Sequence, residues 1–107
     1  MKLYINLTPH TINVYEGGIL VNSFPPNGEP ARISIKREKV MEQDGVSFYH
    51  QAKGPVEGLP SEREDTFYIV STLVRLEVPS RKDLLSPGDL LRDGAGKPIG
   101  CDGFDFN

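Results

Sequence analysis

The sequence predicts a mainly β fold, a small barrel or sandwich with one short helix, and an α+β fold is the alternative. Eleven glycines and nine prolines among 107 residues indicate many turns, because both residue types tend to end helices and strands. The strict alternation of apolar and polar residues in "ARISIK" is typical of a strand. Only residues 67–77 are apolar at helical as well as strand spacing. The chain length predicts one compact domain over residues 1–107.

The first third of the chain predicts a broken strand followed by a hairpin. Apolar residues alternate over 3–7 and again over 12–14, so we expect two short strands, or one strand broken at Pro9. The two glycines of "EGG" favour a turn, after which "ILVNSF" would return as the hairpin partner. The prolines and Asn-Gly of "PPNGEP" then end this strand.

The middle of the chain predicts a second hairpin and a long loop. Ala31, Ile33 and Ile35 alternate with polar residues, which predicts a strand with one apolar face. The Asp-Gly pair at 44–45 predicts a turn into the partner strand. Residues 50–65 are polar and interrupted by Gly and Pro, so we expect a connection of about sixteen residues that is mobile or functional.

The last third predicts a buried strand, a short helix and a closing hairpin. The strand covers 67–70 and the helix about 71–77. Their inward-facing residues are then Ile69, Val70, Leu73 and Val74. Residues 90–101 predict a hairpin around a glycine-rich turn at 94–96, with Cys101 as a small buried residue on its second strand.

Charge and composition exclude several classes of function. The net charge of −3 argues against sequence-independent nucleic-acid binding, which needs a basic surface. One cysteine excludes an internal disulfide and is too few for a zinc site built from thiolates. There is neither an apolar run of the roughly 20 residues that a membrane helix needs nor a charged leader before an apolar segment. We therefore expect a soluble, cytoplasmic protein without membrane contact, and its small size favours a homo-oligomer.

The common enzyme motifs are absent. The chain has no GxSxG, GxxxxGK[ST], HExxH, CxxC or GxGxxG motif in a suitable context. We therefore predict a protein that is not an enzyme, with no catalytic residues, no cofactor and no metal ligands. A nucleophilic Cys101 assisted by His10 or His50 remains an alternative, since a thiolate needs a nearby base.

The arginines are the strongest candidates for a binding site. Several lie near the ends of predicted elements, and a guanidinium group can bind phosphate or carboxylate through two parallel hydrogen bonds. The predicted ligand-binding residues are Arg32, Arg75, Arg81 and Arg92 for charge, and Asn6, Thr8, His10 and Ser71 for orientation. The alternative is that Arg81 with Asp83, and Arg92 with Asp93, form structural pairs.

Several motifs carry a resemblance over nearly the whole chain. They are NLTPHxI, YIVSxLV, PxRxDxxxPGxxxRD and GxxIGCxGF. Together they resemble a family of short proteins from bacteria, phages and prophages. The resemblance implies a phage or prophage accessory protein that acts on host machinery or host signalling molecules.

Two functional expectations follow. The first is a binding protein that sequesters a small anionic ligand, such as a nucleotide second messenger of an antiviral system. The alternative is a protein-binding or structural accessory factor, which docks on a host partner through residues 50–65 and an exposed strand edge.

Overall fold

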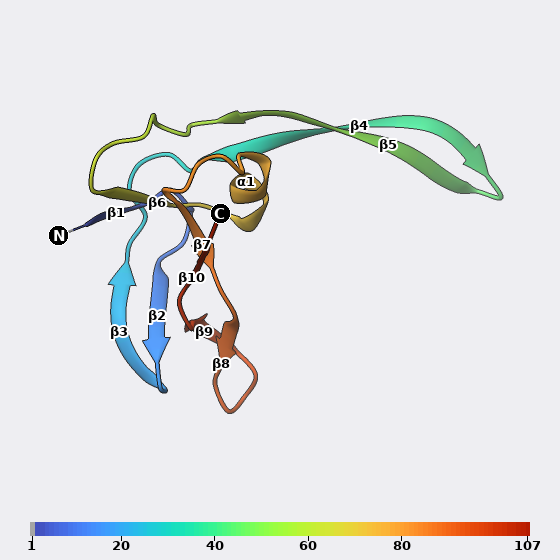
Figure 1. Ribbon diagram of the computed structural model, residues 1–107. Helices are drawn as coiled ribbons and strands as arrows, with labels where there is room; N and C mark the ends of the chain where they lie inside the picture. Colours follow the sequence, from blue (N-terminus) through green and yellow to red (C-terminus); the bar gives the residue numbers. More distant parts are fainter. Residues whose placement is uncertain (1) are drawn as a thin grey trace.

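The computed structural model describes residues 2–107 and holds ten strands in three sheets and one short helix (Figure 1). The predicted mainly β fold with a single helix is confirmed. The sheets are open and do not close into a barrel, which fits the sandwich form of the prediction. That the whole chain forms one domain stays a prediction.

The first sheet carries the core. Its strands lie in the order β1 (Leu3–Asn6), β6 (Thr66–Ile69), β7 (Leu84–Pro87) and β10 (Phe104–Phe106). β1, β6 and β7 are parallel, and β10 is antiparallel to β7. The helix α1 (Thr72–Glu77) lies in the connection between β6 and β7, as a parallel pair requires. The large buried apolar residues of this region are Tyr68, Ile69, Val70, Val74, Leu84 and Leu85.

The predicted strand and helix at 67–77 are confirmed, with one error. Ser71 caps α1, because its side-chain oxygen accepts a hydrogen bond from the backbone N–H of Val74 at 3.3 Å. Val74 is buried, but Leu73, which was predicted to face inward, is 39% exposed. A helix of six residues has fewer than two turns, so it presents only a narrow stripe to the sheet.

The second sheet joins two hairpins. Its order is β3 (Ile19–Phe24), β2 (Ile12–Glu16), β9 (Pro98–Cys101) and β8 (Leu90–Arg92). The two antiparallel pairs are the predicted hairpins, and β1 and β2 are separate strands on either side of Pro9. Cys101 is 2% exposed, as predicted. The hairpins meet through one parallel pair between β2 and β9.

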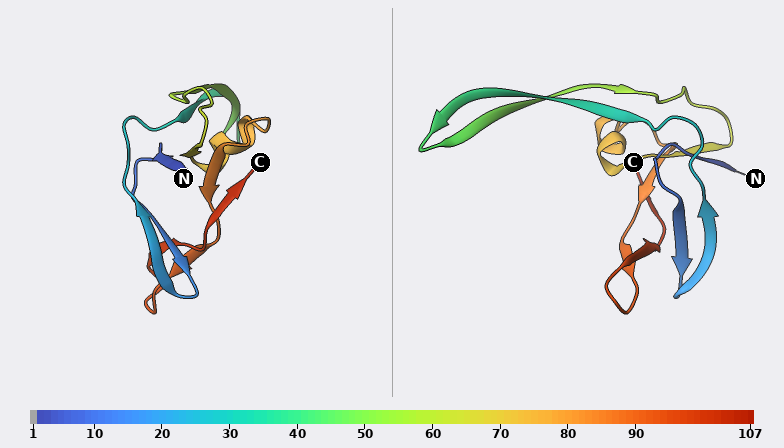
Figure 2. Two further views of the ribbon diagram at one scale, coloured as in Figure 1. Left: turned by 60° about the vertical axis from the view of Figure 1, so that its left-hand side comes forward. Right: turned by 180° about the vertical axis from the view of Figure 1, so that it is seen from behind.

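The third sheet is a two-stranded ribbon that we call the arm, residues 32–57. It consists of β4 (Arg32–Gln43) and β5 (Val46–Glu57) and extends far from the other elements, as Figure 1 and the right-hand view of Figure 2 show. The predicted Asp-Gly turn is confirmed: Asp44 and Gly45 have φ values of 55° and 75°, the left-handed geometry that a tight hairpin requires.

The arm corrects the prediction for residues 50–65. Residues 50–57 belong to β5 and pair with β4, and only 58–65 form a connection. The Gly54-Pro55 pair, which suggested a loop, lies where the register shifts opposite Ile33 and Ile35. A bulge at this point absorbs the proline, which cannot donate to the ladder.

The apolar face predicted for Ala31, Ile33 and Ile35 is covered along only part of its length. Ala31 is 6% exposed and Ile33 packs against the core, whereas Ile35 is 47% exposed. The ribbon leaves the rest of the molecule between Ile33 and Ile35, where the register shifts. The alternation therefore predicts the strand correctly but does not show which of its apolar residues are covered.

Candidate functional site

Asn6 and Thr8, two of the predicted ligand-binding residues, form a buried structural network. The Asn6 amide nitrogen donates to the carbonyl oxygens of His10 and Phe24, each at 2.8 Å. Its oxygen accepts from the backbone N–H of Thr8 at 2.9 Å and from the Thr8 hydroxyl at 2.7 Å. The amide is thus saturated from within, and it shapes the connection from β1 to β2. The imidazole of His10 is exposed, while its carbonyl oxygen belongs to the network.

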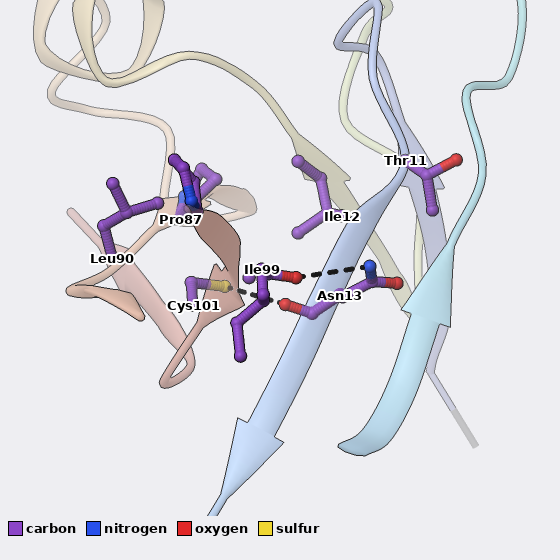
Figure 3. Close-up of a pocket in the computed structure, with 9 residues that line it drawn as sticks. Thr11, Ile12, Asn13, Pro87, Leu90, Ile99 and Cys101 are labelled. Atoms are coloured by element: carbon purple, nitrogen blue, oxygen red, sulfur yellow. Dashed lines mark hydrogen bonds between the residues drawn. The ribbon is translucent and has the colours of Figure 1, made fainter. Parts of the chain in front are cut away.

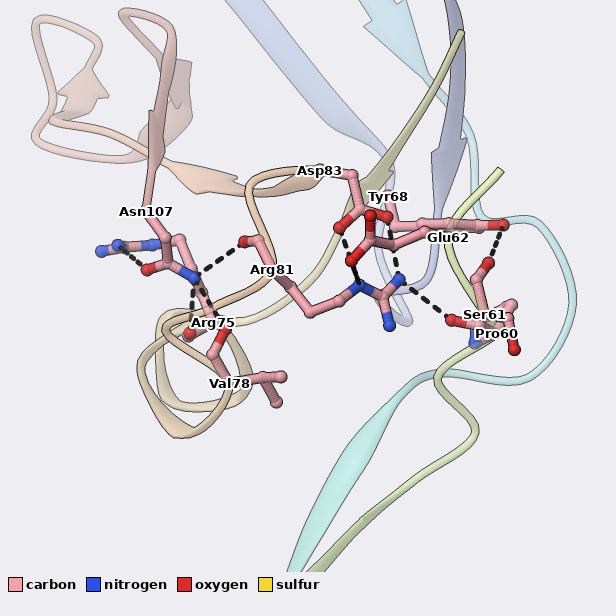
Figure 4. A network of polar contacts seen from close by, with 9 residues as sticks. All are labelled: Pro60, Ser61, Glu62, Tyr68, Arg75, Val78, Arg81, Asp83 and Asn107. Atoms are coloured by element: carbon pink, nitrogen blue, oxygen red, sulfur yellow. Dashed lines mark hydrogen bonds and ion pairs between the residues drawn. The ribbon is translucent and has the colours of Figure 1, made fainter. Parts of the chain in front are cut away.

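Arg75 ties α1 to the first sheet. Its Nε donates to Ser86 Oγ at 2.7 Å, and Ser86 is fully buried. Its Nη1 donates to Asn107 Oδ1 at 3.0 Å, as Figure 4 shows. The Asn107 amide nitrogen in turn lies 3.0 to 3.1 Å from the carbonyl oxygens of Arg75, Val78 and Arg81. These bonds satisfy the end of the helix.

Arg81 forms a bidentate pair with Asp83. Its Nε and Nη2 donate to the two carboxylate oxygens at 2.8 Å each, and Nη2 also donates to the Pro60 carbonyl oxygen at 3.0 Å (Figure 4). Glu62 approaches Arg81 at 3.4 Å. The hydrogen bonds from Arg81 lower the pKa of Asp83 below its ordinary value of 3.8, against the opposing effect of burial. The same bonds raise the pKa of Arg81. The geometry therefore matches the alternative that Arg81 and Asp83 form a structural pair.

The remaining predicted residues lie in other places. Arg32 begins the arm and faces Glu57 at 3.6 Å, with both side chains exposed. Arg92 ends β8 and donates to the Gly96 carbonyl oxygen at 2.8 Å, so it closes its own hairpin rather than pairing with Asp93. Ser71 caps the helix. Asn107 links Arg75 with Arg81, but Arg32 and Arg92 share no hydrogen-bond partner with them within residues 2–107.

A pocket of about 350 Å³ lies between β2, β8 and β9 (Figure 3). Asn13 lines the pocket, and its amide nitrogen lies 3.4 Å from the Ile99 carbonyl oxygen. The Cys101 thiol donates to the Asn13 carbonyl oxygen at 3.6 Å. The described residues that line it include neither arginine nor any other charged side chain. The pocket therefore suits an apolar group better than an anion. Its lining is Thr11, Ile12, Asn13, Pro87, Leu90, Pro98, Ile99, Gly100 and Cys101.

A second hollow, also of about 350 Å³, lies where the first and second sheets meet. We call it the aromatic groove, and its lining is Tyr4, Val14, Val21, Asn22, Phe24 and Phe104. The rings of Tyr4 and Phe24 are 5.2 Å apart, and those of Phe24 and Phe104 are 5.9 Å apart. Such tilted pairs present both ring faces and ring edges to a ligand.

The arm carries exposed apolar side chains on both faces. Met41 lies opposite Phe48, and Val46 lies opposite Gln43, so Met41, Val46 and Phe48 share one face near the turn. We call these three residues the arm tip; they are 48%, 56% and 44% exposed. On the other face, the Arg37 guanidinium lies over the Tyr49 ring at 4.0 Å.

The sequence analysis did not identify the arm tip as a candidate site. The signal was present in "VMEQDGVSFY", which places apolar residues on both sides of a tight turn. A hairpin that buried them would look the same in sequence, because burial depends on what the strands pack against.

The described part of the chain was searched for clusters of metal-ligating side chains and for helices that could span a membrane. No group of three or more His, Cys, Asp or Glu side chains among residues 2–107 could hold a metal ion. Within the same range no helix has the length and apolar character needed to cross a membrane.

Comparisons with protein-family models, with curated proteins and with solved structures give no match to this chain.

Proposed function

We propose that the protein is a non-enzymatic protein-binding module that uses the arm to dock on a partner protein. The observation that carries this proposal is the exposed apolar arm tip on a ribbon that packs against the core only at its root. A two-stranded ribbon alone is marginally stable in water, so apolar residues on it gain most from a covering surface. Both edges of the ribbon are also free to pair with a further strand.

The arm is anchored at its root, which suits a docking element. Ile33 and Val56 pack against the core, and Lys53 Nζ contacts Glu77 Oε1 of α1 at 2.7 Å. The tip has no such support within the described residues, because the strands beyond this root are exposed on both faces. A rigid root with an exposed tip lets the ribbon bind without reordering the core.

The phage or prophage accessory role belongs to this proposal through the resemblance of the sequence motifs. In that role the partner of the arm is a protein of the host or of the phage. Residues 50–57, which the sequence assigned to a docking loop, would contribute as part of β5.

Sequestration of a small anionic ligand is less supported than protein binding. Arg75 and Arg81 already donate to side chains and carbonyl oxygens of the protein, and Arg92 closes its own turn. A nucleotide would have to displace these bonds. Thermal stabilisation of the protein by cyclic or ADP-ribose-type nucleotides, lost on replacement of Arg75, would restore the ligand hypothesis.

The protein-binding proposal is tested by changing the arm tip. The wild-type protein, Phe48→Ser and the control His50→Ser are each used to capture proteins from the host together with a differently tagged second copy. His50 lies two residues along β5 on the same face and is polar. We expect wild type and His50→Ser to retain a protein that Phe48→Ser loses, and the purified components to reproduce this difference. Equal capture by all three variants would contradict the proposal.

A further inference from the structure

We propose that the partner of the arm is a second copy of this chain, and that two copies exchange arms reciprocally. The arm tip of each copy sits in the aromatic groove of the other. This inference rests on the proposed protein-binding function, and it specifies the partner.

The exposed area of the chain exceeds that of a compact monomer by more than a stable interface buries on each partner. The accessible surface is 7379 Å², whereas a compact monomer of 11.9 kDa exposes about 6,000 Å². The excess is about 1,400 Å², and a stable interface buries about 800 Å² on each partner. The radius of gyration, 17.0 Å, likewise exceeds the roughly 13 Å of a compact chain of this length.

The arm tip and the aromatic groove are chemically complementary. Phe48 can pair with aromatic rings in the offset or tilted arrangements that rings prefer. The Met41 thioether makes favourable contacts with aromatic rings. The groove offers three rings, of Tyr4, Phe24 and Phe104. Both surfaces are apolar, and both are exposed in a single copy.

The arm cannot fill the groove of its own chain. In Figure 1 the arm runs away from β1, β2 and β3, and the opposite view in Figure 2 agrees. The groove is lined by β1, β2, β3 and β10. Both surfaces can therefore be covered together only when another copy supplies its arm.

The two parts of the chain differ in net charge, and reciprocal exchange brings them together. Residues 32–57 hold five Lys or Arg and four Asp or Glu, a net charge of +1. The rest of the chain holds seven basic and eleven acidic residues, a net charge of −4. A twofold axis forms the contact between arm tip and aromatic groove twice and closes the assembly.

The dimer is tested by sedimentation equilibrium over a range of protein concentrations. We compare wild type with Phe48→Ser in the arm tip, Val21→Ser in the groove and His50→Ser as the control. Val21 is 54% exposed, so neither test variant removes a core residue. We expect a dimer for wild type and the control, and a dissociation constant at least about 30-fold higher for each test variant, as loss of a central interface residue predicts.

A cross-linking experiment locates the contact. Phe48→Cys and Val21→Cys are prepared separately, mixed, and treated with a short bismaleimide; the native Cys101 is buried and does not compete. We expect a covalent heterodimer in the mixture and a much lower yield with each variant alone.

Three results would overturn the dimer: a monomer at every concentration, a dimer that both test variants leave intact, or assemblies that keep growing with concentration. These results separate the two proposals. A monomeric protein whose arm tip still binds a purified host protein rejects the second copy and keeps the protein-binding function. A monomeric protein whose arm tip binds nothing rejects both.

Discussion

At the scale of single residues, most of the polar side chains that the sequence marks as ligand-binding make hydrogen bonds within the fold instead, and Arg32 and the imidazole of His10 are exposed. Arg81 illustrates why the sequence could not decide between the two roles. Asp83 is two residues away and visible as a partner, but the Pro60 carbonyl oxygen lies twenty-one residues away. For Arg75 the partners Ser86 and Asn107 lie eleven and thirty-two residues away along the chain. The sequence shows that these arginines can donate hydrogen bonds, but only the fold determines which acceptors they reach.

The Arg81–Asp83 pair makes stability depend on pH in acid. Because the folded-state pKa of Asp83 lies below 3.8, its contribution is complete above that pH and is lost as pH falls through the lowered value. We predict that Asp83→Asn lowers the free energy of unfolding by about 1.5–3 kcal/mol at pH 7, the usual range for a hydrogen-bonded charged group. The difference from wild type should shrink below pH 4. Urea unfolding at both pH values measures it.

Asp105→Asn is the matched control for this prediction, since it removes the same charge from an exposed position on β10. We expect the control to follow the wild-type curve at both pH values. A loss of the same size at pH 7 and in acid for Asp83→Asn would show that the carboxylate charge is not what stabilises the pair.

At the scale of elements, the turns and the hairpins around them were predictable, whereas the full length of β5 and the pairing of strands distant in sequence were not. Gly17, Gly18 and Gly45 have positive φ, and the sequence placed a turn at each. The length of β5 was missed because residues 50–57 read as polar loop until they pair with β4. The short strands β7 and β10 were also missed. Each has three or four residues, and their pairing with each other spans a long stretch of chain.

Gly100 allows the two hairpins of the second sheet to approach each other closely. A Cβ at this position would lie 2.5 Å from the Asn13 carbonyl oxygen and 2.8 Å from the Tyr15 ring. β2 and β9 are joined by a single residue pair, so no neighbouring pair would hold the two strands together if a new Cβ pushed them apart. We predict that Gly100→Ala costs about 1–3 kcal/mol of stability, the usual cost of overpacking. Gly94→Ala, with nothing within 4 Å, should cost much less, as chemical denaturation of both variants will show.

At the scale of the whole molecule, the core and the arm share few contacts. The core cluster of buried residues draws only on the root of the arm, through Ile33 and Val56. The sequence predicts an apolar strand at 31–36 but not where it leaves the body, because that depends on a bulge and on the absence of a second layer beyond it. The candidate site could not be predicted for the same reason, because the sequence does not show whether other elements cover the apolar residues of the arm tip.

Shortening the arm separates folding from assembly. We predict that replacing residues 37–51 by Asn-Gly, which joins the paired Lys36 and Ala52 through a tight turn, leaves the body folded. The core residues and the Lys53–Glu77 contact remain, so the monomer should keep its stability within about 1 kcal/mol, as expected for surface changes. Its radius of gyration in small-angle scattering should fall towards the roughly 12 Å of a compact chain of its length. The shortened protein should also remain monomeric at concentrations where the wild type dimerises. If it unfolds instead, the arm belongs to the folding unit of the body, and if it dimerises with wild-type affinity, the arm tip is not the contact.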